Sequence, residues 1–264
     1  MVTRILHVSD LHTGARDDPV VAQALAGMVE SARPELILAS GDLTHRGRRD
    51  QHERAAALLR SLGVPVLAVP GNHDIPYSFP ARFSHPWREF DREWETTEPV
   101  YASPSLHAVG LNSVRPWRHQ SGGLTEEQLD RAAARLAEAA PGALRVVALH
   151  HQLVNAPWRS RKKPVARRDH VLARLASAGA ELIVGGHVHQ VAVAERREFA
   201  VLDGPAAPVV ISIAPGIGQP RPHRLGEARG CAVYVADDDA LTVETSIWVD
   251  GGWTRTASRR FARG

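Results

Sequence analysis

The chain has 264 residues, 44% of them hydrophobic and 23% charged, and a formal net charge of +3, as in an ordinary globular protein with a sizeable core. Its single cysteine, Cys231, excludes an internal disulfide and suits a reducing compartment. No apolar stretch approaches the roughly 20 residues that cross a bilayer, and the apolar run before Ser9 is too short for a signal peptide. We therefore expect a cytoplasmic protein without a membrane partner. The mild positive charge permits an anionic substrate without requiring nucleic acid.

The first half of the chain alternates short β-branched runs with longer amphipathic ones. Strands buried on both faces are predicted at residues 4–9, 35–40 and 65–69. Helical spacing lies between them, over residues 19–32 and 48–63. This βαβαβ order implies a parallel sheet with right-handed crossovers.

The rest of the chain contains three kinds of segment. The insert at 80–98 is expected to form a loop with one short helix, with its role left open. Further strands are predicted at 105–113, 144–151 and 181–186, and helices at 125–140 and about 169–178, the first with a capping box of Thr125 and Gln128. From about residue 191 only short strands and turns follow, which suggests an antiparallel second sheet. We expect one domain over 1–264 with a C-terminal all-β portion from about 191.

Potential metal ligands follow five of the predicted strands. Carboxyl ends of strands in such sheets are where ligands gather. The side chains of residues i and i+2 in extended backbone point the same way, so two of the groups can each converge on one ion. Five groups at one edge are hard to explain as turns. They are Asp10-Leu11-His12, Gly41-Asp42, Gly71-Asn72-His73-Asp74, His150-His151 and His187-Val188-His189.

Seven candidate ligands are too many for one tetrahedral ion with an open position. They suit two ions that share a carboxylate, and Asp42 lies where such a bridge is needed. Two metals ~3.5–4 Å apart hold a bridging hydroxide and clamp the oxygens of an in-line phosphoryl displacement. His73 is placed to protonate the departing alkoxide, with Asn72 as a ligand and Asp74 as the support of the catalytic turn.

The order of these blocks, D-x-H, G-D, G-N-H-D, H and G-H-x-H, resembles the calcineurin-like metallophosphoesterases, and all five lie between residues 10 and 189. The resemblance implies an α/β fold, a four-layer αββα sandwich of two mixed β-sheets, with a binuclear centre. It implies that one metal takes Asp10, His12 and His189. The other would take Asn72, His150 and His187, with Asp42 bridging. The family metals are manganese, iron or zinc.

Within the family, the compact size, the "GDLTHRG" block and the "HVH" pair look most similar to the bacterial cyclic-nucleotide phosphodiesterase-like branch. Two departures stand out. Many relatives carry an acidic residue three positions after the bridging aspartate, where this chain has His45. The orientation of His73 then falls to Asp74 or to a backbone carbonyl. The histidine pair is also followed by "QLVNAPW" and not by prolines, so the loop over the site is expected to differ.

Five further features are candidates for a role in the site or for a structural or surface role. Arg46 suits contact with a phosphate and is equally well explained as a solvated arginine. Asn112 and His151 are further candidates for contact with the substrate. The run at 158–168 holds six basic residues and either steers anionic substrates or forms a solvated face. His7, inside the first strand, is expected to be a hydrogen-bonded core histidine.

The sequence thus predicts a binuclear metal-dependent phosphoesterase in which a metal-bridging hydroxide attacks a nucleotide-type phosphodiester, a cyclic nucleotide among the candidates. The alternatives are a phosphomonoesterase, a phospholipid or nucleic-acid phosphodiesterase of the same fold, and a non-catalytic metal-binding scaffold. A nucleic-acid substrate is not favoured, because the basic run has only Trp158 for base stacking.

Overall fold

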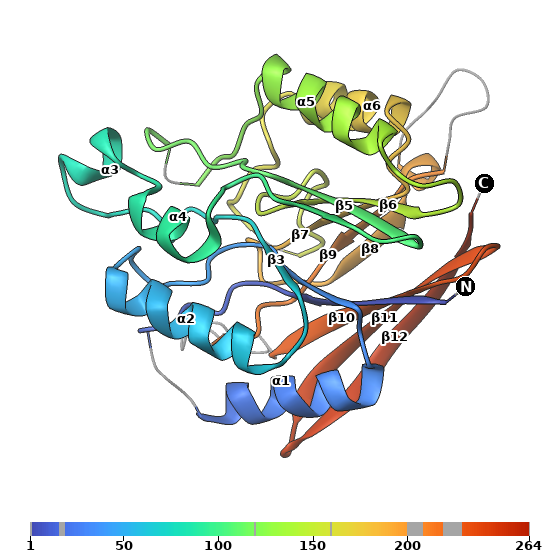
Figure 1. Cartoon of the computed structure of the whole chain (residues 1–264), viewed down its shortest axis with the longest axis horizontal. Coiled ribbons are helices and arrows are strands. Elements are labelled where there is room, and N and C mark those ends of the chain that lie inside the picture. The colour runs from blue at the N-terminus through green and yellow to red at the C-terminus, as the bar shows by residue number, and fades with distance from the viewer. Residues whose placement is uncertain are drawn as a thin grey trace.

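Two six-stranded β-sheets face each other in the computed structural model, which describes residues 2–15, 19–118, 120–158, 160–199, 208–218 and 229–263. The core between the sheets is built from alternate residues of both, such as Ile5, Leu38, Val146 and Val184. Helices cover the two outer faces (Figure 1). The expected four-layer αββα sandwich is therefore confirmed.

The first sheet has the strand order β12-β11-β10-β1-β2-β3. Its parallel half is the predicted βαβαβ unit, because β1 pairs parallel with β2 and β2 with β3. The apolar stripes of the two connecting helices pack on the outer face of this sheet through Leu25, Met28 and Leu59. The unit comprises β1 (Thr3–Val8), α1 (Pro19–Ala32), β2 (Leu36–Ala39), α2 (Arg49–Ser61) and β3 (Val66–Ala68).

The second sheet has the order β4-β5-β6-β7-β9-β8 and is parallel except at its two edges. Its outer face is covered by α5 and α6 (Figure 1). The Thr125–Gln128 capping box is present at the start of α5. The elements are β4 (Val100–Ala102), β5 (Leu106–Leu111), α5 (Glu126–Ala137), β6 (Leu144–Leu149), α6 (Arg168–Ser177), β7 (Leu182–Gly185), β8 (Ala192–Glu195) and β9 (Val210–Ile213).

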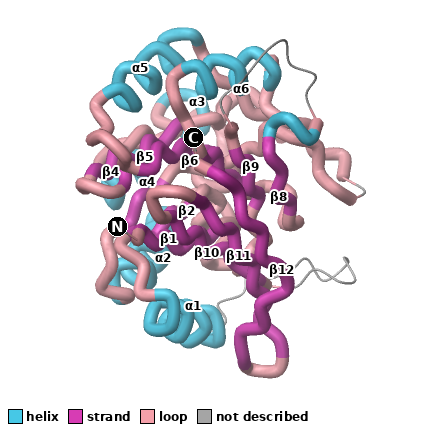
Figure 2. Tube along the Cα trace, turned by 90° about the vertical axis from the view of Figure 1, so that its right-hand side faces the viewer, coloured by secondary structure: helices cyan, strands magenta, loops and turns pink. Residues whose placement is uncertain are grey.

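The segment after residue 191 does not form a sheet of its own, so that expectation was wrong. β8 and β9 join the second sheet, where β9 pairs parallel with β7. The last three strands extend the first sheet as an antiparallel meander (Figure 2). They are β10 (Gly230–Ala236), β11 (Ala240–Val249) and β12 (Gly252–Ala262). A 3₁₀ turn, η1 (Arg196–Glu198), directly follows β8.

The insert at 80–98 carries two short helices where one was expected, α3 (Ala81–Ser84) and α4 (Arg88–Trp94). Phe90 of α4 is fully buried in the outer core of the first sheet, so this part of the insert belongs to the fold. Within the described ranges, no helix is long and apolar enough to span a bilayer.

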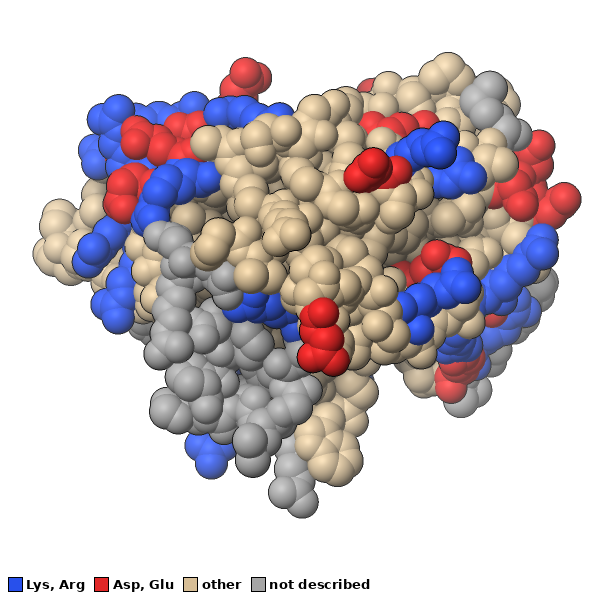
Figure 3. Space-filling model, turned by 90° about the horizontal axis from the view of Figure 1, so that it is seen from below, with Lys and Arg blue, Asp and Glu red and all other residues tan. Residues whose placement is uncertain are grey.

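The outer surface carries mixed charge. Acidic and basic side chains are interspersed on the face seen from below in Figure 3. On α2, Arg49 pairs with Glu53 and Arg54 with Asp50, one helical turn apart. Arg60 reaches Glu93 of α4. These three arginines are therefore balanced locally by acidic neighbours.

Candidate metal centre

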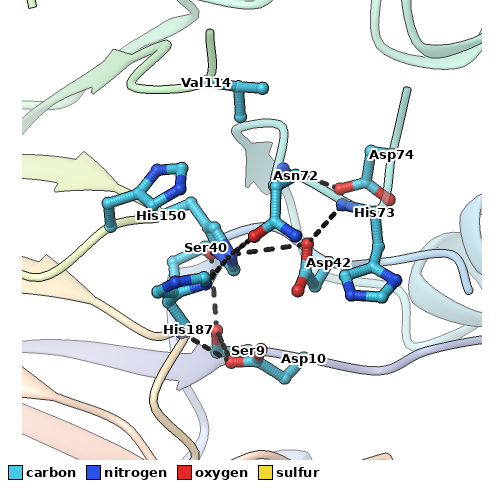
Figure 4. A network of polar contacts seen from close by, with 12 residues as sticks. Ser9, Asp10, Ser40, Asp42, Asn72, His73, Asp74, Val114, His150 and His187 are labelled. Carbon is cyan, nitrogen blue, oxygen red and sulfur yellow. Dashed lines mark hydrogen bonds and ion pairs between the residues drawn. The ribbon is translucent and has the colours of Figure 1, made fainter. Parts of the chain in front are cut away.

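The carboxyl ends of β1, β2, β3, β6 and β7 meet at one edge of the sandwich, and their following turns bring the predicted ligands together (Figure 4). Asp10, Asp42, His150 and His187 have no solvent-exposed area. Burying charged groups costs several kcal/mol unless they are paired or bind a cation. A cation at the centre of such a cluster would therefore stabilise its buried carboxylates.

The backbone at these turns is unusual. Nine non-glycine residues of the described chain have a positive φ, a conformation that L residues seldom adopt. Five of the nine are candidate ligands, and strain of this kind concentrates at functional sites. The five are Asp10, His12, Asp42, His187 and His189, with φ between 50° and 69°.

One group of side chains gathers around Asp10. Its Oδ1 lies 3.0 Å from Nε2 of His189. Nε2 of His12 lies 3.2 Å from the same nitrogen of His189 and 3.9 Å from Oδ2 of Asp42. The other oxygen of Asp10 is held in place by the Ser9 hydroxyl at 2.6 Å and the His187 backbone amide at 3.0 Å.

A second group gathers around His150. Its Nε2 lies 3.1 Å from Nδ1 of His187, 3.3 Å from Oδ1 of Asn72 and 3.4 Å from Oδ1 of Asp42. The two oxygens of Asp42 therefore face different groups, Oδ2 the first and Oδ1 the second. Asp42 lies between the groups, as the sequence predicted for a shared carboxylate.

The tautomers of two of these histidines are set by backbone carbonyl oxygens, which accept hydrogen bonds and cannot donate them. His150 Nδ1–H donates to the Ser40 oxygen at 2.8 Å, and His187 Nε2–H donates to the Gln120 oxygen at 3.1 Å. The other nitrogen of each ring is directed into the cluster. Metal-binding histidines are commonly oriented in this way.

The electrostatics fit a cation as well. Burial alone raises the pKa of Asp10 and Asp42, but the neighbouring histidines outweigh it and hold both pKa values well below the ordinary range. Burial lowers the pKa of His150, yet Asp42 raises it to about 9 in the metal-free protein. Asp42 Oδ2 is buried and accepts no hydrogen bond from the described residues. Oxygen and imidazole donors of this kind suit manganese, iron or zinc.

His73 lies at the edge of the cluster, with its ring centroid 4.9 Å from that of His12. Its backbone amide donates to Asp42 Oδ1 at 2.8 Å. Nδ1 donates to the backbone oxygen of His45 at 2.8 Å, so a backbone carbonyl orients the ring. The carboxylate of Asp74 hydrogen-bonds to backbone amides and to the Thr44 hydroxyl, so it has a different task.

Asp74 holds two turns together. Its carboxylate accepts the backbone amides of Thr44 at 2.7 Å, Gly71 at 2.8 Å and Leu43 at 3.2 Å. The Thr44 hydroxyl donates to it at 2.9 Å. These bonds fix the turn after β2, which carries Asp42, against the turn after β3, which carries Asn72 and His73.

The three candidates for substrate contact are placed differently. His151 is buried, shares a 2.8 Å hydrogen bond with Ser113 through Nδ1, and leaves Nε2 without a partner among the described residues. Asn112 is buried and its Oδ1 accepts the Val114 amide at 3.0 Å. Arg46 is exposed, and its guanidinium carbon lies 5.5 Å from the ring centroid of Tyr77.

The basic run at 158–168 borders the centre. Arg159 lies outside the described residues. Lys162 is half-buried and its amine donates to the backbone oxygen of His187. Arg167 pairs with Glu126 on α5, so the run is only partly a solvated face.

Several residues of the site were not predicted from the sequence. Ser9 and Gln120 act through a hydroxyl and a main-chain oxygen, for which no sequence pattern exists. Tyr77 lies 2.9 Å from His73 Nδ1 through its hydroxyl. Its spacing of four residues from His73 was the only signal, and it is a weak one.

His7 has the role expected of a core histidine. Its two ring nitrogens hydrogen-bond to the Tyr234 hydroxyl at 2.7 Å and to the Ser40 hydroxyl at 2.8 Å, one as a donor and the other as an acceptor. The Tyr234 hydroxyl donates in turn to Ser212 at 2.9 Å. This buried network crosses from the first sheet to the second behind the metal centre.

Three bacterial proteins with related sequences are named cyclic nucleotide phosphodiesterases. A protein of Synechococcus sp. named a probable cyclic nucleotide phosphodiesterase is 31% identical over 160 residues, which is 57% of this chain and 58% of that protein. One of Rhodococcus erythropolis with the same name is 29% identical and covers 70% of this chain and 64% of that protein. These two alignments thus span about three fifths of the relatives' lengths. A 3',5'-cyclic adenosine monophosphate phosphodiesterase of Haemophilus influenzae is 25% identical, covering 78% and 76%.

Solved structures support the fold. A dimetal phosphatase from Danio rerio superposes with a TM-score of 0.68 at 15% identity, covering 99% of both chains. A purple acid phosphatase from yellow lupin gives a TM-score of 0.72 at 15% identity and covers all of this chain and 54% of its own. The family description "Calcineurin-like phosphoesterase" matches residues 3–191, well over half of the sequence. The chain belongs to the calcineurin-like phosphoesterase family.

Proposed function

We propose that this protein is a phosphodiesterase that works with two metal ions. The observation that carries the proposal is the position of Asp42, whose two carboxylate oxygens face two separate groups of nitrogen and oxygen ligands. By this assignment Asp10, His12 and His189 hold one ion, and Asn72, His150 and His187 hold the other. Manganese, iron and zinc all suit this donor set.

Two bound ions would supply a nucleophile from water at neutral pH and neutralise charge on the phosphoryl oxygens. The protein's own residues have three tasks. The carbonyls of Ser40 and Gln120 each accept a hydrogen bond from one ring nitrogen of His150 and His187, which aims the other nitrogen of each ring at the metal position. Asp74 keeps the two ligand turns in register. His73 gives a proton to the leaving oxygen through Nε2, since its Nδ1 is occupied by the His45 carbonyl.

Nucleotide-type phosphodiesters, cyclic nucleotides among them, are the proposed substrates. The names of the three bacterial relatives support this choice. Arg46, Asn112 and His151 are proposed contacts for the substrate. A nucleic-acid backbone is not favoured, because the basic run at 158–168 has only Trp158 for base stacking. The proposal includes a cytoplasmic location, because the single cysteine suits a reducing compartment.

Hydrolysis of bis(p-nitrophenyl) phosphate against p-nitrophenyl phosphate tests the proposal. The protein is stripped of metal and reloaded separately with manganese, iron or zinc, and bound metal is counted. We expect two ions per chain, diester cleavage that depends on them, and loss of both in Asp42→Asn. Asp50→Asn, which removes an exposed carboxylate on α2, is the matched control.

Two outcomes would redirect the proposal. A strong preference for the monoester would make the protein a phosphomonoesterase. Two tightly bound ions without turnover of either ester or of a cyclic nucleotide would favour the metal-binding scaffold.

A further inference from the structure

We propose that Tyr77 is a positioning residue for His73, and that together they adapt the site to phosphodiesters with a poor leaving group, such as a sugar alkoxide. This inference rests on the proposed phosphodiesterase function. It names a residue outside the five ligand blocks, on the loop between β3 and α3.

The hydroxyl of Tyr77 makes a specific contact with the His73 ring. It lies 2.9 Å from Nδ1 and 3.5 Å from Nε2. Nδ1 also lies 2.8 Å from the His45 carbonyl oxygen, which can only accept a hydrogen bond. Nδ1 therefore carries a hydrogen, and this hydrogen is shared between two oxygen acceptors. Nε2 is then the nitrogen that gives up or receives the proton.

Core packing does not account for the place of Tyr77, because 45% of its surface is exposed. Polar contacts hold its loop in position. Arg82, with 4% exposure, donates to the Pro76 oxygen at 3.2 Å and to the Pro116 oxygen at 2.7 Å. The Arg46 guanidinium stacks on the tyrosine ring from outside. The tyrosine side chain is exposed, and a buried arginine fixes the backbone of its loop. This arrangement indicates that the contact with His73, and not core packing, accounts for the position of Tyr77.

The other sides of His73 are also defined. The His45 ring is stacked on the His73 ring at 5.8 Å with an interplanar angle of 25°. The His73 amide is anchored on Asp42 Oδ1, and the His73 carbonyl oxygen lies 3.0 Å from the Thr44 hydroxyl, whose one hydrogen it shares with Asp74. Together with the contact to Tyr77, these interactions fix the His73 ring and leave Nε2 as the reactive atom. Two acceptors on Nδ1–H hold the ring in one orientation during the transfer.

The consequence concerns the leaving group. The attacking water gives one proton to the solvent. As its oxygen bonds to phosphorus, the bond from phosphorus to the leaving oxygen breaks, and the Nε2 proton passes to that oxygen. His73 ends neutral, with Nδ1–H still held. A nitrophenolate leaves without a proton, whereas an alkoxide does not. The contacts that fix His73 are therefore needed only for esters whose leaving group is an alkoxide.

The test is Tyr77→Phe, assayed on methyl aryl phosphodiesters whose leaving groups range from p-nitrophenol to phenol, and on cyclic AMP. We expect kcat to fall about tenfold for phenol and cyclic AMP and about twofold or less for p-nitrophenol, with KM unchanged. Tyr101→Phe, the same change on β4, should leave all rates as they are. When His73 is already replaced by alanine, Tyr77→Phe should not lower kcat any further.

A second readout needs no metal and no turnover. The proton on His73 Nδ1, assigned by its loss in His73→Ala, should give a protected NMR signal in the metal-free protein. In Tyr77→Phe the signal should shift and exchange faster, and in Tyr101→Phe it should not. An unchanged signal, or an equal loss of kcat across all leaving groups, would overturn the positioning role. Absence of turnover in the wild type would contradict the proposed function, while the NMR result still decides whether Tyr77 holds His73.

Discussion

His150 Nε2 and His187 Nδ1 face each other at 3.1 Å, and the second nitrogen of each ring donates to a backbone carbonyl. Two lone pairs cannot hydrogen-bond to each other, so a proton or a cation has to lie between them. Without metal, the raised pKa of His150, about 9, means that a proton takes this place. A metal ion would displace the proton and bind Asn72 and Asp42 as well.

Metal binding should therefore stabilise the fold. Manganese at about 100 times its dissociation constant should add about 2.7 kcal/mol to the free energy of unfolding of the stripped protein. Asp42→Asn should lose most of this gain, because it removes a charge that both groups share. Thermal melts with and without manganese measure the effect, with Asp50→Asn as the control. A full gain in Asp42→Asn would show that the aspartate does not bind metal.

Asp74 should matter for stability even without metal. In Asp74→Ala three backbone amides lose their acceptor in a buried setting, at about 1–3 kcal/mol each. We expect a loss of about 3 kcal/mol or more in urea unfolding of the stripped protein. Asp50→Ala, at an exposed ion pair, should cost about 1 kcal/mol or less. An equal loss of unfolding free energy in Asp74→Ala and Asp50→Ala would show that Asp74 does not hold the two turns together.

Gly186 should tolerate no side chain. A Cβ there would lie 1.7 Å from the Ser9 hydroxyl and 2.6 Å from Asp10 Oδ2. Gly186→Ala should displace Asp10 and weaken manganese binding, measured by calorimetry, at least tenfold by the loss of an aligned ligand. Gly27→Ala is the contrasting control, because nothing lies within 4 Å of its Cβ in α1. It should stabilise the protein by about 0.5–1 kcal/mol and leave metal binding unchanged. Similar metal affinity in both variants would contradict the close approach at Gly186.

The parts of the site that follow a strand could be predicted from the sequence. Asp10, Asp42 and His150 all end buried strands, and the topology of a parallel sheet brings such ends to one edge. The path of the chain after residue 191 could not be predicted, because short strands with similar alternation pair equally well in either sheet. Only tertiary contacts decide that β9 lies beside β7.

The orientation of the site residues was also beyond the sequence. His73 is held by the main chain of His45 and by the Tyr77 hydroxyl, and a carbonyl oxygen leaves no pattern in the residue types. The departure at His45 left two candidates to orient His73, the Asp74 carboxylate and a backbone carbonyl, and the carbonyl of His45 is the one in contact with the ring. Choosing between the two required coordinates.

The buried network of His7 gives a prediction of pH dependence. Burial lowers the pKa of His7 from 6.5 to about 3, with Asp10 opposing the shift. Between these two values the unfolded chain binds a proton that the folded chain does not. The free energy of unfolding therefore falls by about 1.4 kcal/mol for each pH unit between about 6.5 and about 3, and this part of the stability is fully present above 6.5.

His7→Gln removes this titration and retains a group that can hydrogen-bond to Tyr234 and Ser40. Urea unfolding of the two metal-free proteins at pH 7.5 and pH 5.5 measures the effect. The wild type should lose more stability than the variant over this step, by about 1.4 kcal/mol. The other buried histidines contribute equally to both proteins, so they cancel in the comparison. Parallel losses in the two proteins would mean that His7 is protonated in the fold, and that the network between the sheets carries a charge.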